Sequence, residues 1–445
     1  MHGPYSHPVK EVQLHTFSAG ASAALAGPDW LRERRAAGYA AFESTALPSE
    51  SEEVWRYTPI ERLDLAEFEP PDSSGNGAVV PPAYDLVESL AAALGPVAGR
   101  VLVHNGRPDA FVLPAEAGSI SFGGAADVRG AADMLGSVQD GGDALVRLND
   151  AFAPDAVFID VPGGSVVEAP LLVVHWCDAG AAFPRTCVRA GEGARVSVVE
   201  VFAGPAVGTR TLVVPVTEVS AAESATLAYV SLQILGASAW SIARLAARGL
   251  DAATLRTFTV GLGAAYDRVR ADVSVEGRDA RSEILSAYLG DGAQVHDIRT
   301  LQDHRAPRTD SELLCQGAVA GESRSIYSGL IRVHRGAVRS DARQTNHNLV
   351  LDEGAHADSV PNLDILENDV KCSHASTVGP LDEDQRYYIE SRGIAPDVAE
   401  GLLVQGFFDA IIDRGPIPAL TPILEREVHD RLNAALGGRR VAAGA

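Results

Sequence analysis

Two residues near the carboxyl end of this 445-residue chain have types and spacing that suit metal chemistry. Cys372 and His374 are separated by one residue, so on a β-strand both side chains point to the same face. A thiolate and an imidazole are ligands suited to iron or an iron–sulfur cluster. Two ligands do not close a stable site, so others must come from elsewhere in the chain or from another subunit. The residues alone equally fit a buried cysteine beside a hydrogen-bonded histidine.

The remaining cysteines and the late histidines give weaker signals. Four widely spaced cysteines without a Cys-x-x-Cys pair argue against a disulfide framework and against a self-contained structural zinc site. Cys177 and Cys315 follow apolar runs, and we interpret them as core residues. Three histidines with irregular spacing are expected to be solvated or hydrogen-bonded in the core: His334, His347 and His356.

The acidic residues leave an enzyme hypothesis open. Asp341 and Arg343 point to one face of an expected strand, and Asp358 and Asp364 follow nearby. Clustered carboxylates with arginine on a β-helix would suit a carbohydrate-active lyase or hydrolase. On a chain whose net charge is −22, a solvated acidic face is the alternative that we favour.

Lysine is nearly absent, and this excludes one class of enzyme. The two lysines are Lys10 and Lys371, and neither follows a glycine. A Walker A loop needs Gly-Lys-Ser/Thr to bind phosphates. We therefore expect a non-catalytic subunit that has no ATPase activity of its own.

Charge and hydropathy narrow the partners and the location. A net charge of −22 disfavours binding to nucleic acid or to an anionic membrane, because both require clustered positive charge. No apolar run approaches the ~18 residues of a membrane-spanning helix, and the first residues lack the pattern of a signal peptide. The sequence therefore predicts a cytoplasmic protein that binds neither nucleic acid nor membrane.

The elements that must position these residues divide the chain into three stretches. Residues 1–154 are mixed and mostly helical, and Ser49–Phe68 carries apolar residues at helical spacing. Residues 155–381 hold short alternating segments rich in Val, Thr and Ile, each of strand length. Residues 382–445 are helical, and we expect this region to contain a partner-binding surface.

Small residues recur between the strand-like segments and indicate a solenoid. Five Gly-Ala pairs are expected to form corners, beginning at Gly193, Gly292, Gly317, Gly336 and Gly354. Tight hairpin signals are scarce, since residues 155–381 contain no Asn-Gly and one Asp-Gly. A solenoid fits best, and a β-sandwich is the alternative. The expected fold is mainly β: a right-handed parallel β-helix core between helical N-terminal and C-terminal regions.

The middle C-terminal helix is expected to serve two surfaces. Part of its apolar face is expected to cap the open end of the solenoid, and the rest is available for a partner. At helical spacing this face combines Val398, Leu402, Leu403, Phe407, Ala410 and Ile411.

Several motifs resemble one known family. Asn368–Phe408 contains Asp-Val-Lys-Cys-Ser-His, Thr-Val-Gly, Leu-Asp and Ser-Arg-Gly-Ile in that order. Further matches are Pro361–Ile365 (PNLDI), Glu53–Thr58 (EVWRYT) and the block Asp160–Val173. These motifs are spread over nearly the whole chain. They resemble the SufB/SufD family of the SUF iron–sulfur cluster assembly system, in its SufD branch.

The resemblance implies a scaffold subunit that pairs with a SufB-type paralogue and with a SufC-type ABC ATPase. The ATPase is expected to bind the C-terminal helices. A nascent iron–sulfur cluster, transient and shared with the SufB-type subunit, is expected to form at their interface. His374 is the expected ligand there, and Cys372 is a second candidate. No cofactor is expected to stay on the isolated chain, and flavin binding by the complex is left open.

Two further alternatives remain beside the carbohydrate-active enzyme. One is a SufB-type subunit that itself carries the cluster cysteine; the lack of cysteine in residues 354–361, where such chains have one, disfavours it. The other is that the isolated chain forms a homodimer in place of the heterodimer with the SufB-type paralogue.

Overall fold

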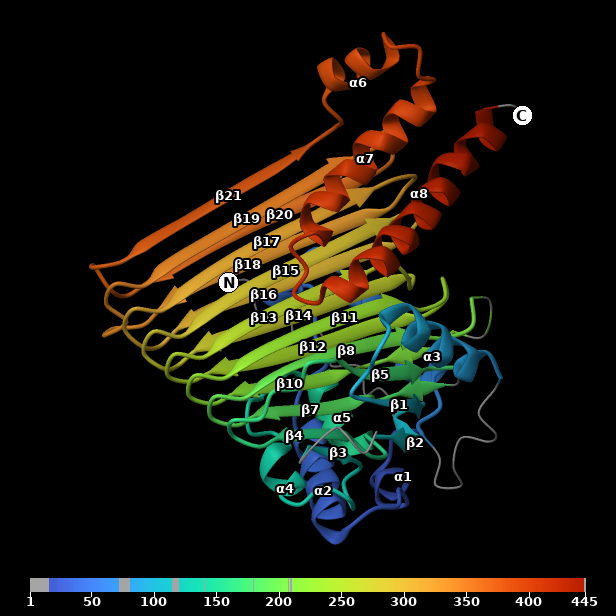
Figure 1. Cartoon of the computed structure of the whole chain (residues 1–445). Helices are drawn as coiled ribbons and strands as arrows, with labels where there is room; N and C mark the ends of the chain where they lie inside the picture. The colour runs from blue at the N-terminus through green and yellow to red at the C-terminus, as the bar shows by residue number, and fades with distance from the viewer. Residues whose placement is uncertain are drawn as a thin grey trace, which may run out of the picture.

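The core of the molecule is a coil of parallel strands, seen in a computed structural model that describes residues 16–71, 81–113, 120–139, 141–178, 180–206, 208 and 210–443. From β4 to β21 the strands alternate between two sheets, sheet A and sheet B, and consecutive turns stack in parallel register (Figure 1). The predicted fold class is confirmed: a mostly β protein with a parallel β-solenoid of about eight turns and helices at both ends.

The two sheets contain the following strands in spatial order. Sheet A comprises β2 (Arg107–Val112), β1 (Gly99–His104), β5 (Leu171–Trp176), β8 (Arg195–Ala203), β11 (Thr226–Ile234), β13 (Thr254–Gly261), β15 (Arg281–Gly290), β17 (Asp310–Val319), β19 (Asp341–Val350) and β21 (Lys371–Gly379). Sheet B comprises β3 (Ser121–Gly123), β4 (Val157–Val161), β7 (Arg185–Ala190), β10 (Val216–Ala221), β12 (Trp240–Gly249), β14 (Tyr266–Val275), β16 (Val295–His304), β18 (Arg324–Val333) and β20 (His356–Ile365), with β6 (Ala181–Ala182) and β9 (Leu212–Val213) beside this path.

Alternate residues of each strand face the interior of the coil, where they stack on the same position of the next turn. Ile284 on β15 is in register with Leu313 on β17, and both are buried in the cluster between the sheets. Burying a side chain of this size stabilises the fold by about 1.5–3 kcal/mol. Because each turn buries its face only against its neighbours, the stack depends on what closes each end.

At most corners of the coil a left-handed residue is followed by a small buried residue, although Ala293 after Gly292 is exposed. Gly193, Gly292 and Gly336 have φ values of 64°, 58° and 88°, as expected for Gly-Ala corners. The prediction at Gly317 is wrong, because Gly317 lies inside β17. Other corners place non-glycine residues in the same conformation and were not recognised: Ser224, Ala252, Asp279, Arg308 and Arg339.

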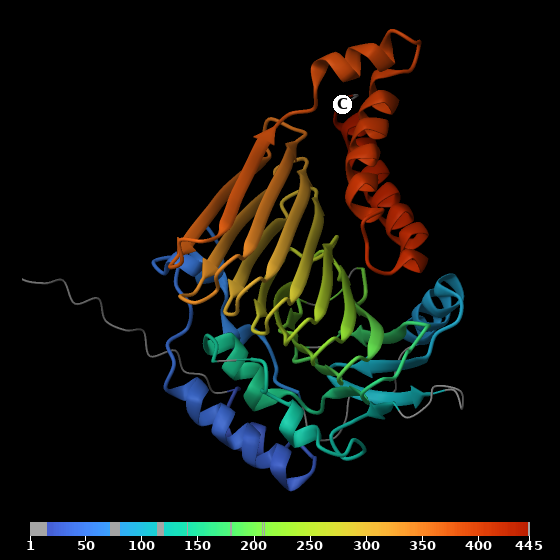
Figure 2. The same ribbon diagram turned by 60° about the vertical axis from the view of Figure 1, so that its left-hand side comes forward.

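The outer face of sheet A is covered by helices from both ends of the chain. These are α3 (Pro81–Leu94), α7 (Pro396–Ile412), the short η5 (Pro418–Leu420) and α8 (Thr421–Ala443). Phe408 of α7 is fully buried in one cluster with Phe258 of β13 and Leu285 of β15. The predicted capping of the open end is therefore wrong, because α7 and α8 run back along sheet A (Figure 2). Of the predicted apolar face, Ile411 alone is fully buried.

In the first turns of the solenoid, aromatic side chains fill the interior and helices cover the outer face of sheet B. Here β2 and β3 pair antiparallel with β1 and β4, and the rings of Phe111 and Phe122 meet edge to face at 5.1 Å inside the coil. Outside sheet B lie α1 (Ala19–Ala23), α2 (Asp29–Glu43), α4 (Ala131–Met134) and α5 (Ala144–Phe152), and Trp30 of α2 contacts Phe158 of β4. The sheets thus begin before residue 155. In the described part of the chain, no helix is long and apolar enough to cross a bilayer.

The helix expected over Ser49–Phe68 is absent. Three single turns replace it: η1 (Glu53–Trp55), η2 (Ile60–Arg62) and η3 (Leu65–Glu67). Tyr57 has a φ of 71°, which interrupts any helix, and Trp55 is buried with the Arg268 guanidinium 3.7 Å from its ring centre. Tertiary contacts with sheet B therefore override the helical spacing of the segment.

Candidate functional site

Cys372 and His374 lie on β21, the last strand of sheet A. β21 pairs in register with β19, whose inward residues Ala342 and Gln344 are buried and face Cys372 and His374 in the ladder. Cys372 packs against the interior residues of the last turns. Both candidate ligands therefore lie on one face of β21, as their spacing predicted, and the register shows that this face is the inward one.

This inward row is uncovered, because the coil is open at β20 and β21. Among the described residues no strand pairs with the far edge of either strand, and no helix lies over their inward rows (Figure 2). Leu363 on β20 and Val378 on β21 each remain 43% exposed. We call this surface the open end; its inward residues are Ala357, Ser359, Pro361, Leu363 and Ile365 of β20 and Cys372, His374, Ser376 and Val378 of β21.

Hydrogen bonds tie the open end to the turns below it. Ser359 and Ser376 bond through their hydroxyls at 2.6 Å, and Ser359 also donates to the Asn346 carbonyl oxygen at 2.8 Å. Asn348 donates to Asn346 at 2.7 Å, and the hydroxyl of Tyr288 donates to Asn348. The last turn is thus held by polar contacts more than by apolar packing.

The electrostatics of Cys372 favour its thiol form in the chain alone. Burial raises the pKa of Cys372, and the carboxylate of Asp341 raises it further. A metal ligand must be a thiolate, so binding would need a cation to displace the proton. Within the described residues no three His, Cys, Asp or Glu side chains converge on one point, so Cys372 and His374 form at most part of a site.

The other cysteines are core residues, which confirms that interpretation for Cys177 and Cys315. Both are buried, as is Cys187. Burial raises the pKa of all three thiols, that of Cys315 to about 12, so these groups stay protonated and inert.

The late histidines do not join His374. Nε2 of His334 lies 2.8 Å from a carboxylate oxygen of Asp303, and Nε2 of His356 lies 3.1 Å from Asp358. His347 lies on the outward row of β19, on the opposite face of the sheet from His374. These residues are hydrogen-bonded or half-exposed, as expected.

The acidic residues of the enzyme hypothesis are dispersed. Asp341 lies on the outward row of sheet A and pairs with Arg343 at 3.1 Å. Asp364 lies on the outward row of sheet B and pairs with Arg332 at 2.9 Å, and Asp358 on the same strand pairs with His356. Carboxylates on opposite outer faces of a solenoid cannot act on one substrate bond as an acid and base.

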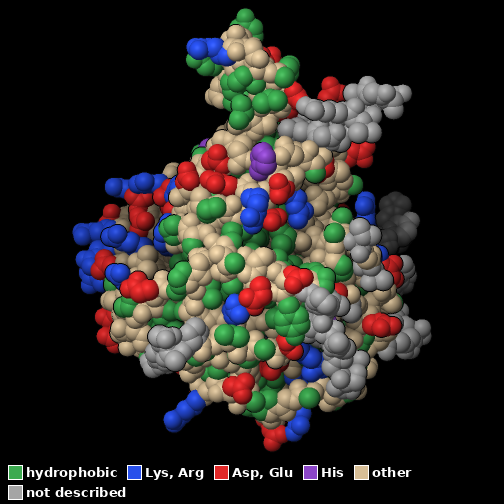
Figure 3. Space-filling model, turned by 45° about the vertical axis from the view of Figure 1, so that its right-hand side comes forward, with side chains coloured by type: hydrophobic (Ala, Val, Ile, Leu, Met, Phe, Trp, Pro, Cys, Tyr) green, Lys and Arg blue, Asp and Glu red, His purple; other side chains and the backbone are tan. Residues whose placement is uncertain are grey.

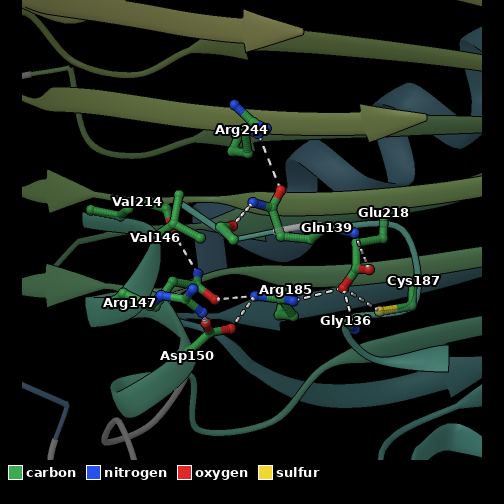
Figure 4. A network of polar contacts seen from close by, with 12 residues as sticks. Gly136, Gln139, Val146, Arg147, Asp150, Arg185, Cys187, Val214, Glu218 and Arg244 are labelled. Atoms are coloured by element: carbon green, nitrogen blue, oxygen red, sulfur yellow. Dashed lines mark hydrogen bonds and ion pairs between the residues drawn. The ribbon is translucent and has the colours of Figure 1, made fainter. Parts of the chain in front are cut away.

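A second polar cluster lies on the outer face of sheet B at the first turns of the solenoid, which we call the closed end (Figure 4). It was not found from the sequence. Buried Arg185 donates to Glu218 at 2.6 Å and to Asp150 at 3.0 Å. Glu218 also accepts the backbone N–H groups of Gly136 and Val138. Burial alone would raise the pKa of Glu218, but Arg185 and these N–H groups hold it below its ordinary value. The cluster is closed on itself and ties a loop to sheet B.

Hydrophobic side chains gather at the projecting tip that α6 (Glu383–Glu390) and the start of α7 build beyond the solenoid (Figure 3). Tyr387 and Tyr388 are 73% and 59% exposed, and Val398 and Leu402 are 50% and 52% exposed. So much exposed apolar area on one projection is typical of a protein-binding surface.

Sequence reasoning missed the polar residues beneath the ligands, namely Gln344, Asn346, Ser359 and Ser376. On β19 the inward and outward rows are both polar, so alternation gave no sign of which residues face the interior. The register with β17 and β21 reveals it.

A family model matches more than half of the chain. It is described as the SufBD core domain of SUF system FeS cluster assembly, and it covers residues 175–407. The matched region runs from the end of β5 into α7 and includes the whole open end.

Individual relatives are similar to this chain over different lengths. The iron–sulfur cluster assembly protein SufD of Escherichia coli is 27% identical over 412 residues, which are 88% of this chain and 90% of that protein. A SufBD family protein of Mycobacterium leprae is 38% identical over 192 residues, 41% of this chain and 47% of its own length. The chloroplastic protein ABCI7 of Arabidopsis thaliana is 29% identical over 304 residues, 66% of this chain and 62% of that protein. The aligned region therefore spans about half of the mycobacterial relative and nearly all of the bacterial SufD.

Proposed function

The chain belongs to the SufBD family of SUF iron–sulfur cluster assembly proteins, and we propose that it serves there as a SufD-type scaffold subunit. One observation carries the proposal: the solenoid ends uncovered, and its last inward row presents His374 and Cys372. Exposed apolar side chains and unpaired strand edges are unfavourable in water, so such an end is typical of a surface that binds another protein.

A SufB-type paralogue is the proposed partner at the open end. The free edges of β20 and β21 offer backbone N–H and C=O groups to a strand of the partner, which would extend both sheets. The same contact would bury Leu363 and Val378, whose exposure is otherwise unfavourable. A second copy of the chain could use the same edges, so the isolated protein is a candidate homodimer.

The nascent iron–sulfur cluster is the proposed cargo of this interface. His374 would supply an imidazole ligand, and Cys372 is the second candidate. Because two donors are too few, the partner must supply the remaining ligands, including thiolate. The cluster would then be stable in the pair and would leave when the interface changes.

The test removes each candidate ligand in the assembled complex. His374→Ala is expected to lower the iron and sulfide content several-fold, because a ligand is lost, while unfolding changes by about 1 kcal/mol or less at this exposed position. Complexes are purified without oxygen and assayed for iron, sulfide and visible absorption. Cys372→Ala is the internal comparison: a normal cluster content would leave His374 acting with partner residues alone. A His374→Ala complex with the wild-type cluster content would remove the histidine from the site.

The projecting tip of α6 and α7 is the proposed binding surface for a SufC-type ATPase. Its exposed tyrosines and leucine provide the apolar and aromatic anchors typical of interface hot spots. Leu402→Asp should weaken ATPase binding about tenfold or more without unfolding the chain, because Leu402 is half exposed. Leu250→Asp, an exposed leucine at a solenoid corner, is the matched control. Equal binding by the wild type and Leu402→Asp would place the ATPase elsewhere.

We further propose that the isolated chain is not catalytic. The dispersal of the carboxylates supports this for the carbohydrate-active alternative. Assays of nucleotide hydrolysis and of polysaccharide cleavage on the pure chain should give background rates. A rate above background that Asp341→Asn abolishes would revive the enzyme hypothesis.

A further inference from the structure

Gln344 on β19 is a buried amide whose polar atoms have no protein partner. Its residue is 2% exposed, and neither Oε1 nor Nε2 makes a hydrogen bond. The other inward amides of the strand, Asn346 and Asn348, are both bonded. An unsatisfied buried amide destabilises a fold. A residue kept at such a position needs an explanation beyond packing.

The neighbouring strand makes room for this side chain. A Cβ atom added to Gly329 of β18 would lie 2.3 Å from Nε2 of Gln344, so any other residue there would displace the amide. The hydroxyl of Tyr327 borders the same space. The amide therefore occupies a space between the sheets that depends on a glycine opposite.

Gln344 lies directly beneath His374 in the parallel ladder. The two residues are register partners of β19 and β21, and both belong to inward rows. Neighbouring strands are about 4.8 Å apart, which a glutamine side chain easily spans. In the described residues no strand lies above His374, so its side chain borders the open end. The Gln344 amide now points toward Gly329 and makes no hydrogen bond, so a rotation of its side chain would bring the amide to the imidazole.

We propose that Gln344 is a positioning residue for His374: its amide binds one imidazole nitrogen and so directs the other nitrogen out of the open end toward the cluster cargo. This inference rests on the proposed function. Histidines that bind metals regularly have the second ring nitrogen fixed by a polar neighbour, which sets the tautomer and the ring orientation. The amide suits this task because it offers both a donor and an acceptor.

Stability and cluster loading separate this role from a structural one. Gln344→Leu keeps the volume and removes an unsatisfied amide, so its unfolding midpoint should equal or exceed that of the wild type. Its complex should nevertheless hold the cluster less firmly, with an affinity at least about tenfold lower. Gln316→Leu is the matched control, because Gln316 is also buried with an unpartnered Oε1 but faces outward from β17. The control should load normally, and Gln344→Glu should restore loading by returning an acceptor of the same length.

A second measurement uses the full chain without any cluster. In protein labelled with ¹⁵N-histidine, the two ring nitrogens of His374, assigned by their loss in His374→Ala, should show one dominant tautomer. In Gln344→Leu their shifts should move toward the average of the two tautomers, and in Gln316→Leu they should not move.

The outcomes distinguish this inference from the proposed function. Normal loading and unchanged His374 shifts in Gln344→Leu, with defective loading in His374→Ala, would overturn the role of Gln344 alone. A lower unfolding midpoint in Gln344→Leu with unchanged shifts would also overturn it, since the amide would then be structural. Normal loading in both Gln344→Leu and His374→Ala would overturn the proposed cluster site at His374, on which this inference rests.

Discussion

The two ends of the solenoid treat polar groups in opposite ways. At the closed end Arg185 pairs with Glu218 and Asp150, and Arg147 also pairs with Asp150. Backbone N–H groups bind both carboxylate oxygens of Glu218. At the open end the Gln344 amide has no partner, and the His374 imidazole lies exposed above it. One end is closed within the single chain, whereas the other leaves apolar side chains exposed and an amide without a partner.

The difference separates residues that stabilise the fold from residues that we propose to contact a partner. A buried ion pair that is fully bonded holds a segment in one place, and losing either member leaves an unpaired charge. Unsatisfied groups and exposed apolar side chains lower stability, and proteins tend to keep them where function requires them. Substitutions at the two ends should therefore have opposite signatures.

The largest effect is expected at the closed end. Arg185→Ala leaves Glu218 buried without its cation, although Asp150 keeps Arg147, and the free energy of unfolding should fall by about 3–5 kcal/mol. The free energy of unfolding is measured by urea denaturation monitored by circular dichroism. The double variant Arg185→Met with Glu218→Leu should regain much of the loss, because both charges are gone. If Arg185→Ala were as stable as the wild type, the ion pairs of this cluster would not stabilise the closed end.

A matched pair on sheet B compares the same row one turn apart. Ile331 on β18 is fully buried and is the register partner of Leu363 on β20, which is 43% exposed. Ile331→Ala should destabilise the chain by about 2–5 kcal/mol, and Leu363→Ala by less than about 1 kcal/mol. Equal losses would mean that the open end is covered in the isolated chain, for example by a second copy.

The smallest effect is a pH dependence from the interior near the open end. His304 of β16 is buried and bonds to Thr309 and Ser311 at 2.7 Å each, and burial lowers its pKa to about 4 against the opposing carboxylates of Asp303 and Asp341. The unfolded chain takes up this proton below its ordinary pKa of about 6.5. The contribution of neutral His304 to the free energy of unfolding is therefore fully present above pH ~6.5. It declines as the pH falls toward 4, and about 2 kcal/mol is lost at pH ~4.5.

His304→Gln tests this assignment. Glutamine retains hydrogen bonds without titrating, so the variant should lose less stability than the wild type between pH 6.5 and 4.5. Parallel curves for the two proteins would assign the acid sensitivity to other groups.

The sequence predicts most of the strands because they are long, apolar and repeated. Alternation alone cannot say where the coil turns, since Arg308 and Arg339 adopt left-handed conformations that only glycine usually signals. Arginines on the outward rows of β7 and β12 also interrupt the apolar alternation, so the pattern indicates these two strands less clearly. Strand register, set by the whole stack, decides these cases.

The candidate ligands were predictable and their surroundings were not. Cys372 and His374 stand out by residue type and spacing, and the family motif marks both. Gln344 and Gly329 are 15 residues apart in sequence and meet only because β18 and β19 lie on facing sheets. Likewise, the position of α7 on sheet A decides which face of the helix is buried, and the apolar periodicity of α7 does not reveal that position.

Because α7 and α8 cover sheet A, part of this sheet stays uncovered during synthesis until both helices have been made. Phe258 on sheet A is buried by Phe408, which emerges from the ribosome 150 residues later. At about 5–20 residues per second, the turns of the coil can stack for roughly 8–30 s while the outer row of sheet A is still bare. During that interval the growing chain presents a long apolar stripe to the cell, so a truncated product that ends before residue 396 should be a client of chaperones or a target for degradation.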